Sequence, residues 1–258
     1  MTHVSVIGCG NMGGAFVKGL ARTGAYEVTA IDLDADALAS VADYADETTS
    51  DISAARDADV VVLAVKPKAV DAVLSDLDLR PDQTLVTIAA GVPRSHVIEQ
   101  TAATVVRIMP NLAAETGDMA AAATQSGIDD DVREMLDAVG EFVEIEEELM
   151  DVSTAVNGSG PAFVFYLIDA MKEAGVDGGL EPEQAETLAA QTFKGAAETV
   201  LRDDRSVDEL IDAVCSPNGT TIEGMDVLWD SDADAAVIDA VAAAEERSRE
   251  LAEDFQDE

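Results

Sequence analysis

Residues 4–14 read VSVIGCGNMGG, and three spaced glycines in this stretch limit the possible folds more than any other feature. An apolar run typical of a buried strand (3–8) leads into Gly8, Gly10 and Gly13, which open a helical pattern at 11–23. The first glycine of such a turn allows a tight bend, and the second lets backbone N–H groups approach a pyrophosphate. The third allows the helix to pack closely on the strand. The motif predicts a dinucleotide-binding turn; a glycine-rich packing turn is the alternative.

An acidic residue, Asp32, ends the next apolar run (26–32). At this place a carboxylate accepts hydrogen bonds from the adenosine 2′-hydroxyl and repels a 2′-phosphate. Asp34 and Asp36 add to the repulsion, and no Lys or Arg stands beside them. The sequence therefore favours NADH over NADPH, with NADPH left open because molar salt would screen the charges. Asp34 is also a candidate N-cap for a helix predicted at 34–44.

Short β-rich runs alternate with helical stretches through the first half of the chain. Further strands are predicted at 58–65, 83–91, 103–111 and 141–146, and further helices at 94–101 and 128–139. Such alternation is typical of an α/β fold, here a doubly wound (Rossmann) parallel sheet with helices on both faces. We predict that this dinucleotide-binding domain occupies residues 1–148.

The β signal disappears after residue 148. Helical periodicity then continues through four stretches, at 149–176, 182–202, 206–215 and 232–255. The 149–176 stretch is too apolar to be solvated on any face, so we expect it to be buried against another subunit. Residues 149–258 are therefore predicted to form an all-α dimerisation and substrate-binding domain.

The charge of the chain excludes several classes of partner. It has 53 acidic and 15 basic residues, for a formal net charge of −38. Such a surface repels nucleic acid and anionic lipid. We interpret the acid as salt adaptation in a halophile's cytoplasm, where a Debye length of ~3 Å at molar salt would screen self-repulsion.

The sequence predicts a cytoplasmic protein without a metal site. Cys9 and Cys215 lie far apart, which predicts neither a disulfide framework nor a Cys/His metal site. No secretion leader is recognisable before the first strand, and no apolar run reaches the ~18 residues that would span a membrane.

The sequence offers few acid–base candidates. His3 and His96 are the only histidines, and each is interpreted as structural. Lys66 follows the 58–65 strand at its carboxyl end, where coenzymes bind in such sheets. A nicotinamide enzyme of this kind suits a substrate that arrives protonated, such as an iminium, because hydride transfer then needs placement more than proton shuttling.

A neutral stretch, CSPNGTT (215–221), stands between two predicted helices. Asn218 and Gly219 both tolerate a positive φ, so the stretch predicts a bend. The bend opens a helix, and its free N–H groups can face an anion. An ordinary capped turn between helices is the alternative.

Six segments together carry a resemblance to a known family. The chain resembles the pyrroline-5-carboxylate reductases over essentially its whole length, with the segments in the family's order. They are GCGNMG (8–13), AVKP (64–67), AAGV (89–92), RIMPN (107–111), NGSGPAF (157–163) and SPNGTTIEGMDVL (216–228).

The resemblance implies reduction of Δ1-pyrroline-5-carboxylate to L-proline with NADH or NADPH, the last step of proline biosynthesis. It also implies a homodimer with interlocked helical domains, often assembled into a ring of dimers. The substrate carboxylate would be held by Ser216 Oγ and by the N–H groups of Gly219, Thr220 and Thr221. Thr221 matches the catalytic threonine whose hydroxyl hydrogen-bonds the ring nitrogen.

The coenzyme residues implied by the resemblance are spread over the first domain. The chain departs from the family's pattern at two places. After Asn111 it has Leu112-Ala113 where the family usually has Thr-Pro, and in the 216–221 loop it has Asn218 where the family usually has a glycine. For Gly158 and Gly160, substrate contact and helix packing remain open alternatives. The implied coenzyme residues are Gly8, Gly10, Asn11, Met12, Gly13, Asp32, Ala64, Val65, Lys66, Pro67, Ala90 and Asn111.

Two other functions are alternatives. A β-hydroxyacid dehydrogenase would place a catalytic lysine early in the interdomain helix, but residues 159–171 contain none and Lys172 comes late. A non-catalytic NAD(P)-binding sensor would have no use for the donor-rich bend at 215–221.

Overall fold

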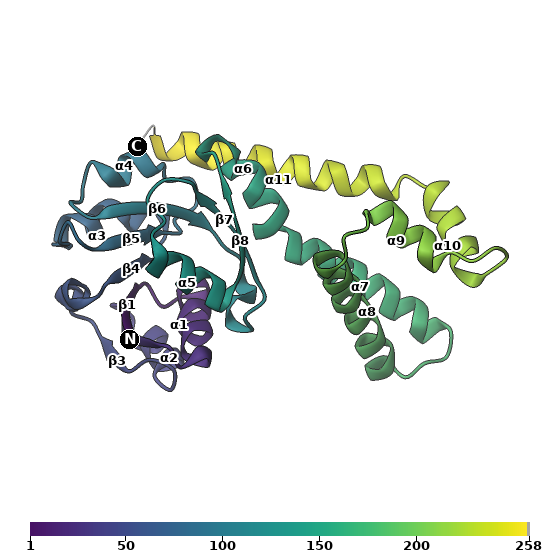
Figure 1. Cartoon of the computed structure of the whole chain (residues 1–258), viewed down its shortest axis with the longest axis horizontal. Helices are drawn as coiled ribbons and strands as arrows, with labels where there is room; N and C mark the ends of the chain where they lie inside the picture. The colour runs from purple at the N-terminus through teal and green to yellow at the C-terminus, as the bar shows by residue number, and fades with distance from the viewer. Residues whose placement is uncertain (257–258) are drawn as a thin grey trace. The chain divides into compact units, whose positions relative to one another are not determined.

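The computed structural model describes residues 1–256, with side chains to residue 253. It divides into two compact units (Figure 1). The first comprises Met1–Gly158 and the chain from Ala242 onward, and the second comprises Ser159–Val241. This division differs from the predicted boundary at residue 148. Residues after 148 join the first unit because Met150 is buried beside Met109 and Ala122, and because Ser248 Oγ donates to Asp151 Oδ1 at 2.7 Å.

An eight-stranded sheet forms the centre of the first unit, in the order β3-β2-β1-β4-β5-β6-β7-β8. All neighbouring strands are parallel except β6 and β7. The strands are β1 (Thr2–Ile7), β2 (Tyr26–Ile31), β3 (Glu47–Thr49), β4 (Val60–Leu63), β5 (Thr84–Thr87), β6 (Thr104–Met109), β7 (Met119–Thr124) and β8 (Gly140–Ile145).

Helices cover both faces of this sheet, as predicted for a doubly wound fold. One apolar core joins the strands to α1, α2 and α5, and a second joins them to η1, α3 and α4. The helices are α1 (Asn11–Thr23), α2 (Ala35–Val41), η1 (Ile52–Asp57), η2 (Pro67–Ala69), α3 (Val70–Asp76), α4 (Arg94–Ile98), η3 (Leu112–Glu115), α5 (Asp130–Val139), η4 (Glu147–Leu149), α6 (Met150–Ser153) and the π-helix η5 (Thr154–Gly158).

Strand β7 was not predicted from the sequence, and it makes the sheet mixed where a parallel sheet was predicted. Its sequence, MAAAAT, contains four alanines, and alanine has the highest helix propensity. Tertiary packing overrides that propensity, because Ala121 and Ala123 are buried in the core that α1 and α5 cover. The strand runs antiparallel to β6 and parallel to β8.

The second unit is entirely helical within the described residues. It contains α7 (Gly160–Asp177), α8 (Pro182–Arg202), α9 (Val207–Val214), α10 (Thr220–Trp229) and the start of α11 (Ala233–Gln256). The helical tract predicted at 149–176 is divided into α6, η5 and α7, and α7 begins within its Gly-Ser-Gly-Pro interruption (158–161). Pro161 lies in the first turn of α7, where its missing N–H costs no helical hydrogen bond.

Helix α7 is apolar, yet none of its residues is buried within this chain. Phe165 and Tyr166 are 67% and 75% exposed. Despite this apolar character, no helix among the described residues is long and apolar enough to cross a membrane.

Candidate active site

The glycine turn at the end of β1 has the shape that a pyrophosphate needs. Gly8 has φ +92°, and a Cβ there would lie 2.6 Å from the carbonyl oxygen of Ala64. A Cβ on Gly13 would overlap the carbonyl oxygen of Gly8, so neither position accepts a side chain. Gly10, in contrast, faces open space and immediately precedes the N-terminus of α1. This combination fits a bound diphosphate, because the helix N-terminus presents N–H groups and Gly10 leaves room for its approach.

A cavity of about 510 Å³ lies beside this turn. Six of the predicted coenzyme residues line it, namely Gly8, Gly10, Asp32, Ala64, Val65 and Lys66. Ile52 and Val73 add apolar walls. An apolar slot with a carboxylate at its rim suits an adenosine group, whose base is flat and whose ribose offers hydroxyl donors.

Asp32 braces the glycine turn. Its Oδ2 accepts the N–H of Cys9 at 2.6 Å, and its Oδ1 accepts the N–H of Asp34 at 2.9 Å. Each carboxylate oxygen retains a further lone pair, so the group can also accept a ribose hydroxyl. Asp34 caps α2 through its bond to the N–H of Asp36 at 2.9 Å, which confirms the capping interpretation.

The thiol of Cys9 is buried within this turn. Burial, and secondarily the negative charge of Asp32, raises the pKa of Cys9 to about 12. The thiolate is the reactive form of cysteine, so this side chain is chemically inert near neutral pH. Cys9 therefore fills space beneath the turn and supplies no nucleophile.

Asn111 follows the carboxyl end of β6, and its side chain makes three hydrogen bonds to the backbone. Its Oδ1 accepts the N–H groups of Ala113 at 3.1 Å and Ala120 at 3.3 Å. Its Nδ2 donates to the carbonyl oxygen of Asn157 at 3.2 Å. With only 8% of the residue exposed, most of its hydrogen-bonding capacity is used internally, and one amide hydrogen remains for a ligand.

Asn157, which is not among the predicted site residues, lies beside Asn111 and bonds three other residues of the first unit. Its Nδ2 donates to the carbonyl oxygens of Met109 at 2.7 Å and Ala120 at 2.9 Å, and its Oδ1 accepts the hydroxyl of Ser153 at 2.9 Å. The available signal was its position at the start of the NGSGPAF segment (157–163), just before Gly-Ser-Gly-Pro.

The predicted substrate loop lies in the second unit and forms a tight bend. Asn218 takes the left-handed conformation, with φ 58°, which its type tolerates. The N–H of Gly219 donates to the carbonyl oxygen of Ser216 at 2.9 Å, so the turn itself uses this donor. Helix α10 follows with no side-chain cap. The donors left for an anion are thus Ser216 Oγ and the first N–H groups of α10, at Thr220 and Thr221.

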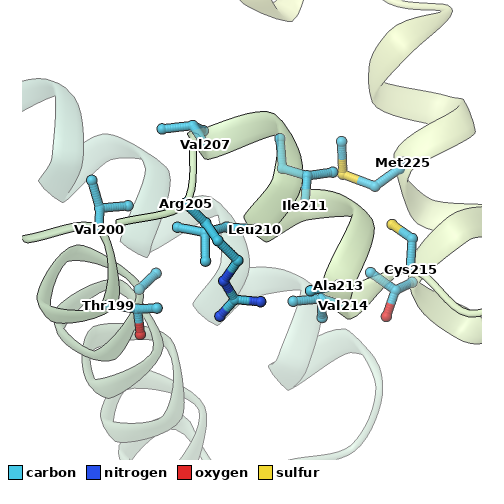
Figure 2. Close-up of a pocket in the computed structure, with 12 residues that line it drawn as sticks. Thr199, Val200, Arg205, Val207, Leu210, Ile211, Ala213, Val214, Cys215 and Met225 are labelled. Carbon is cyan, nitrogen blue, oxygen red and sulfur yellow. The ribbon is translucent and has the colours of Figure 1, made fainter. Parts of the chain in front are cut away.

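Thr221 also lines an apolar cavity of about 370 Å³ within the second unit (Figure 2). Cys215, Ile211 and Met225 form part of its wall, and Arg205 also lines it. The guanidinium of Arg205 is paired with Asp203, which lowers the pKa of the Asp203 carboxyl to about 2. Arg205 is therefore neutralised locally and is not a free anion-binding cation.

Both histidines bond nearby side chains of the first unit. His3 Nε2 bonds Thr29 Oγ1 at 2.9 Å, and His96 Nε2 bonds Asp71 Oδ1 at 2.6 Å. The low pKa of the Asp71 carboxyl arises first from its bond with Gln100 and next from His96. Among the described residues, no group of three potential ligands could hold a metal ion.

Comparison with known proteins agrees with these local structures. Residues 147–251 match a family model for pyrroline-5-carboxylate reductase dimerisation, and residues 3–91 match one for NADP oxidoreductase, coenzyme F420-dependent. A pyrroline-5-carboxylate reductase of Methanosarcina acetivorans is 37% identical, over 96% of this chain and 97% of that protein. The chain belongs to the pyrroline-5-carboxylate reductase family. The reductase of Pseudomonas aeruginosa is 39% identical, over 97% of each chain.

Solved structures of pyrroline-5-carboxylate reductases share the whole fold. That of Coxiella burnetii has a TM-score of 0.85 at 31% identity, covering 97% of this chain and 98% of that one. The Plasmodium falciparum pyrroline carboxylate reductase with NADP bound has a TM-score of 0.80 at 27% identity, with the same coverage. The fold of this reductase chain is thus that of an NAD(P)-binding oxidoreductase.

The rival dehydrogenase family shares only the fold. A 3-hydroxyisobutyrate dehydrogenase of Mycobacterium tuberculosis has a TM-score of 0.52 at 15% identity, covering 99% of this chain and 94% of that one. The chain is therefore a pyrroline-5-carboxylate reductase family member with a distant architectural likeness to that enzyme.

Proposed function

We propose that this chain reduces Δ1-pyrroline-5-carboxylate to L-proline by hydride transfer from NAD(P)H, the last step of proline biosynthesis. The observation that carries the proposal is the 37% identity with a pyrroline-5-carboxylate reductase along nearly the whole of both chains. An alignment over 96% of this chain spans both the sheet unit and the helical unit, which have different tasks in such a reaction.

The coenzyme residues are proposed to act in groups. Gly8, Gly10, Asn11, Met12 and Gly13 would receive the pyrophosphate at the N-terminus of α1, and Asp32 would receive the adenosine ribose. When bound, the reduced nicotinamide supplies the hydride. The residues proposed to flank the rest of the coenzyme are Ala64, Val65, Lys66, Pro67, Ala90 and Asn111.

The substrate loop is proposed to hold a small cyclic acid without using cations. Ser216 Oγ and the loop N–H groups at Gly219, Thr220 and Thr221 would surround the carboxylate, with the Gly219 group shared with the turn. The Thr221 hydroxyl would bond the ring nitrogen and orient the iminium. Hydride adds to the imine carbon, the π-electron pair moves to nitrogen, and the nitrogen keeps its proton, so the product is the cyclic amine.

A preference for NADH over NADPH is proposed from charge. Asp32, Asp34 and Asp36 follow one another closely after β2, and their like charges would raise the cost of binding a 2′-phosphate near them. Comparing kcat/KM for the two coenzymes in molar KCl tests this preference. A higher value for NADPH would reject it.

We also propose how the protein is organised and where it works. Residues 1–148 would serve the coenzyme and 149–258 the dimer and substrate, a division supported by the family match over 147–251. The apolar, unburied α7 supports a homodimer; a ring of dimers is the larger alternative. The charge of −38 supports a halophilic cytoplasm, and the two free thiols suit a reducing compartment.

One assay separates the candidate activities. Oxidation of NADH or NADPH is followed with pyrroline-5-carboxylate, and reduction of NAD+ or NADP+ with 3-hydroxyisobutyrate, both in molar KCl. We expect turnover with the first substrate alone. Turnover only with the second would indicate the dehydrogenase, and coenzyme binding without turnover would indicate a sensor.

Thr221→Ala tests the proposed catalytic residue. Losing a hydroxyl that orients the imine should lower kcat by about 10²-fold, while the affinity for NADH stays near that of the wild type. Thr192→Ala is the matched control, because the hydroxyl of Thr192 donates to the Leu188 carbonyl of its own helix, at 2.7 Å. A Thr221→Ala enzyme that keeps full turnover, or that loses NADH affinity alone, would reject this placement of the loop.

A further inference from the structure

Asn157 connects three segments of the first unit that are distant in sequence. Its side-chain amide donates to Met109 on β6 and to Ala120 on β7, at 2.7 and 2.9 Å. The backbone carbonyl oxygen of Asn157 accepts a hydrogen bond from Nδ2 of Asn111 at 3.2 Å. One residue of the π-helix η5 therefore holds both sides of the Met109-Pro110-Asn111 turn.

The hydrogen-bond partners fix the orientation of this amide. Two carbonyl oxygens can only accept, so the NH₂ group must face Met109 and Ala120. The remaining oxygen, Oδ1, then meets the hydroxyl of Ser153, which donates at 2.9 Å. Every polar atom of the side chain thus has a partner, and the amide is held in a single orientation. A π-helical turn in this place fits a specialised role, because such turns are frequent at functional sites.

The topology of the sheet shows which part of a coenzyme this turn faces. Dinucleotides lie across the carboxyl ends of the parallel strands, and here the strand order reverses between β1 and β4. Asp32, at the end of β2, marks the adenosine side. The nicotinamide half therefore belongs over β4, β5 and β6, and Met109-Pro110-Asn111 is the segment that ends β6.

We propose that Asn157 is a positioning residue for the nicotinamide half of the coenzyme site. It holds the carbonyl of Met109 and the carboxamide of Asn111 in place, and so fixes the floor on which the nicotinamide rests. The inference rests on the proposed reductase function, and it predicts that loss of the Asn157 amide weakens binding of the nicotinamide half while the adenosine half binds normally.

The test compares two ligands that differ by the nicotinamide group. Dissociation constants for NADH and for ADP-ribose are measured in molar KCl with the full-length wild type, Asn157→Ala and Asn157→Asp. We expect the constant for ADP-ribose to stay within about twofold and that for NADH to rise about 5- to 10-fold, as for the loss of one or two hydrogen bonds. Asn157→Asp keeps the shape of the side chain but turns a donor into an acceptor that faces two carbonyl oxygens.

Gln83→Ala is the matched structural control. The amide of Gln83 also donates to two backbone carbonyls, Ala55 at 3.0 Å and Ala58 at 2.7 Å, but it precedes β5 at the amino edge of the sheet. Its loss should leave the NADH to ADP-ribose ratio unchanged. Ser153→Ala removes only the group that orients Oδ1 and serves if the Asn157 variants do not fold; it should change the ratio in the same direction, by about twofold.

Two outcomes would overturn the inference. One is an equal change in both dissociation constants for the Asn157 variants, or for Ser153→Ala if only it folds. The other is a change in the ratio of the NADH and ADP-ribose dissociation constants that is as large in Gln83→Ala as in the Asn157 variants. A separate outcome concerns the proposed function: if the wild type does not reduce pyrroline-5-carboxylate but the ratio shifts as expected, the reductase proposal fails while the positioning role of Asn157 stands.

Discussion

Gly10 and Gly13 stand three residues apart in one motif, yet space around them differs completely. A side chain on Gly13 would overlap the backbone of Gly8, whereas a side chain on Gly10 would meet nothing within 4 Å. Gly10 also has φ −67°, which any residue can adopt. The folded chain therefore requires a glycine at position 13, while at position 10 only a ligand would require one.

This difference predicts opposite effects for two alanine substitutions. Gly13→Ala should lower the free energy of unfolding by about 1–3 kcal/mol, as overpacking does. Gly10→Ala should change it by less than about 0.5 kcal/mol and weaken NADH binding about tenfold or more, because the methyl group blocks the pyrophosphate. Chemical denaturation and NADH titration in molar KCl measure both quantities. If Gly10→Ala binds NADH normally, the diphosphate does not lie on this turn.

Helix α7 illustrates the element scale, since its sequence and its surroundings in one chain disagree. Its residues are mostly apolar, but none is buried, and Phe165 and Tyr166 are largely exposed. Exposed apolar area on this scale marks an interface. In a chain that carries a formal charge of −38, such a surface is the clearest departure from a solvated exterior.

Phe165→Asp tests whether α7 lies in the interface of the proposed homodimer. Burying a carboxylate in an apolar interface is costly, so the dimer dissociation constant should rise by about 10²-fold or more. Size-exclusion chromatography with light scattering in molar KCl should then show monomer at micromolar concentration. Ile98→Asp, on α4 of the first unit, gives the same charge change on a 42% exposed residue and should leave the dimer intact. An intact Phe165→Asp dimer would place the interface elsewhere.

At the scale of the whole molecule, the repulsion between carboxylates is the main electrostatic contribution to the stability of the folded chain. With 53 acidic residues against 15 basic ones, most carboxylates have no cation to pair with. Repulsion over the whole surface destabilises the compact state unless salt screens it. Ion pairs between exposed side chains, such as Lys18–Glu115 at 3.0 Å, contribute little by comparison.

The melting temperature should therefore rise with salt. Between low and molar KCl we expect an increase of at least about 5 °C, since each kcal/mol of relieved repulsion raises the melting temperature by about 2–4 °C. Thermal scans with NaCl and with KCl at equal ionic strength provide the control, because screening depends on ionic strength and not on the cation. A melting temperature indifferent to KCl would contradict the salt-adaptation proposal.

The sequence alone predicted the features that depend on neighbouring residues. The glycine spacing before 11–23 predicted the coenzyme turn, and helix α1 has those bounds in the structure. Periodicity predicted α8 at 182–202, and the Asn-Gly pair predicted the bend at Asn218. These features are local, because strand and helix periods, capping and turn preferences act within a few residues.

Only the tertiary structure decided the features that join distant segments. It made the alanines of 119–124 a strand, because burial between β6 and β8 outweighs their helix propensity. It also placed the end of α11 in the first unit, where the Ser248 hydroxyl donates to the Asp151 carboxylate. It also gave Asn157 its partners, 37 and 48 residues away. Such pairings depend on which surfaces meet after the chain folds, and local sequence preferences carry no information about that.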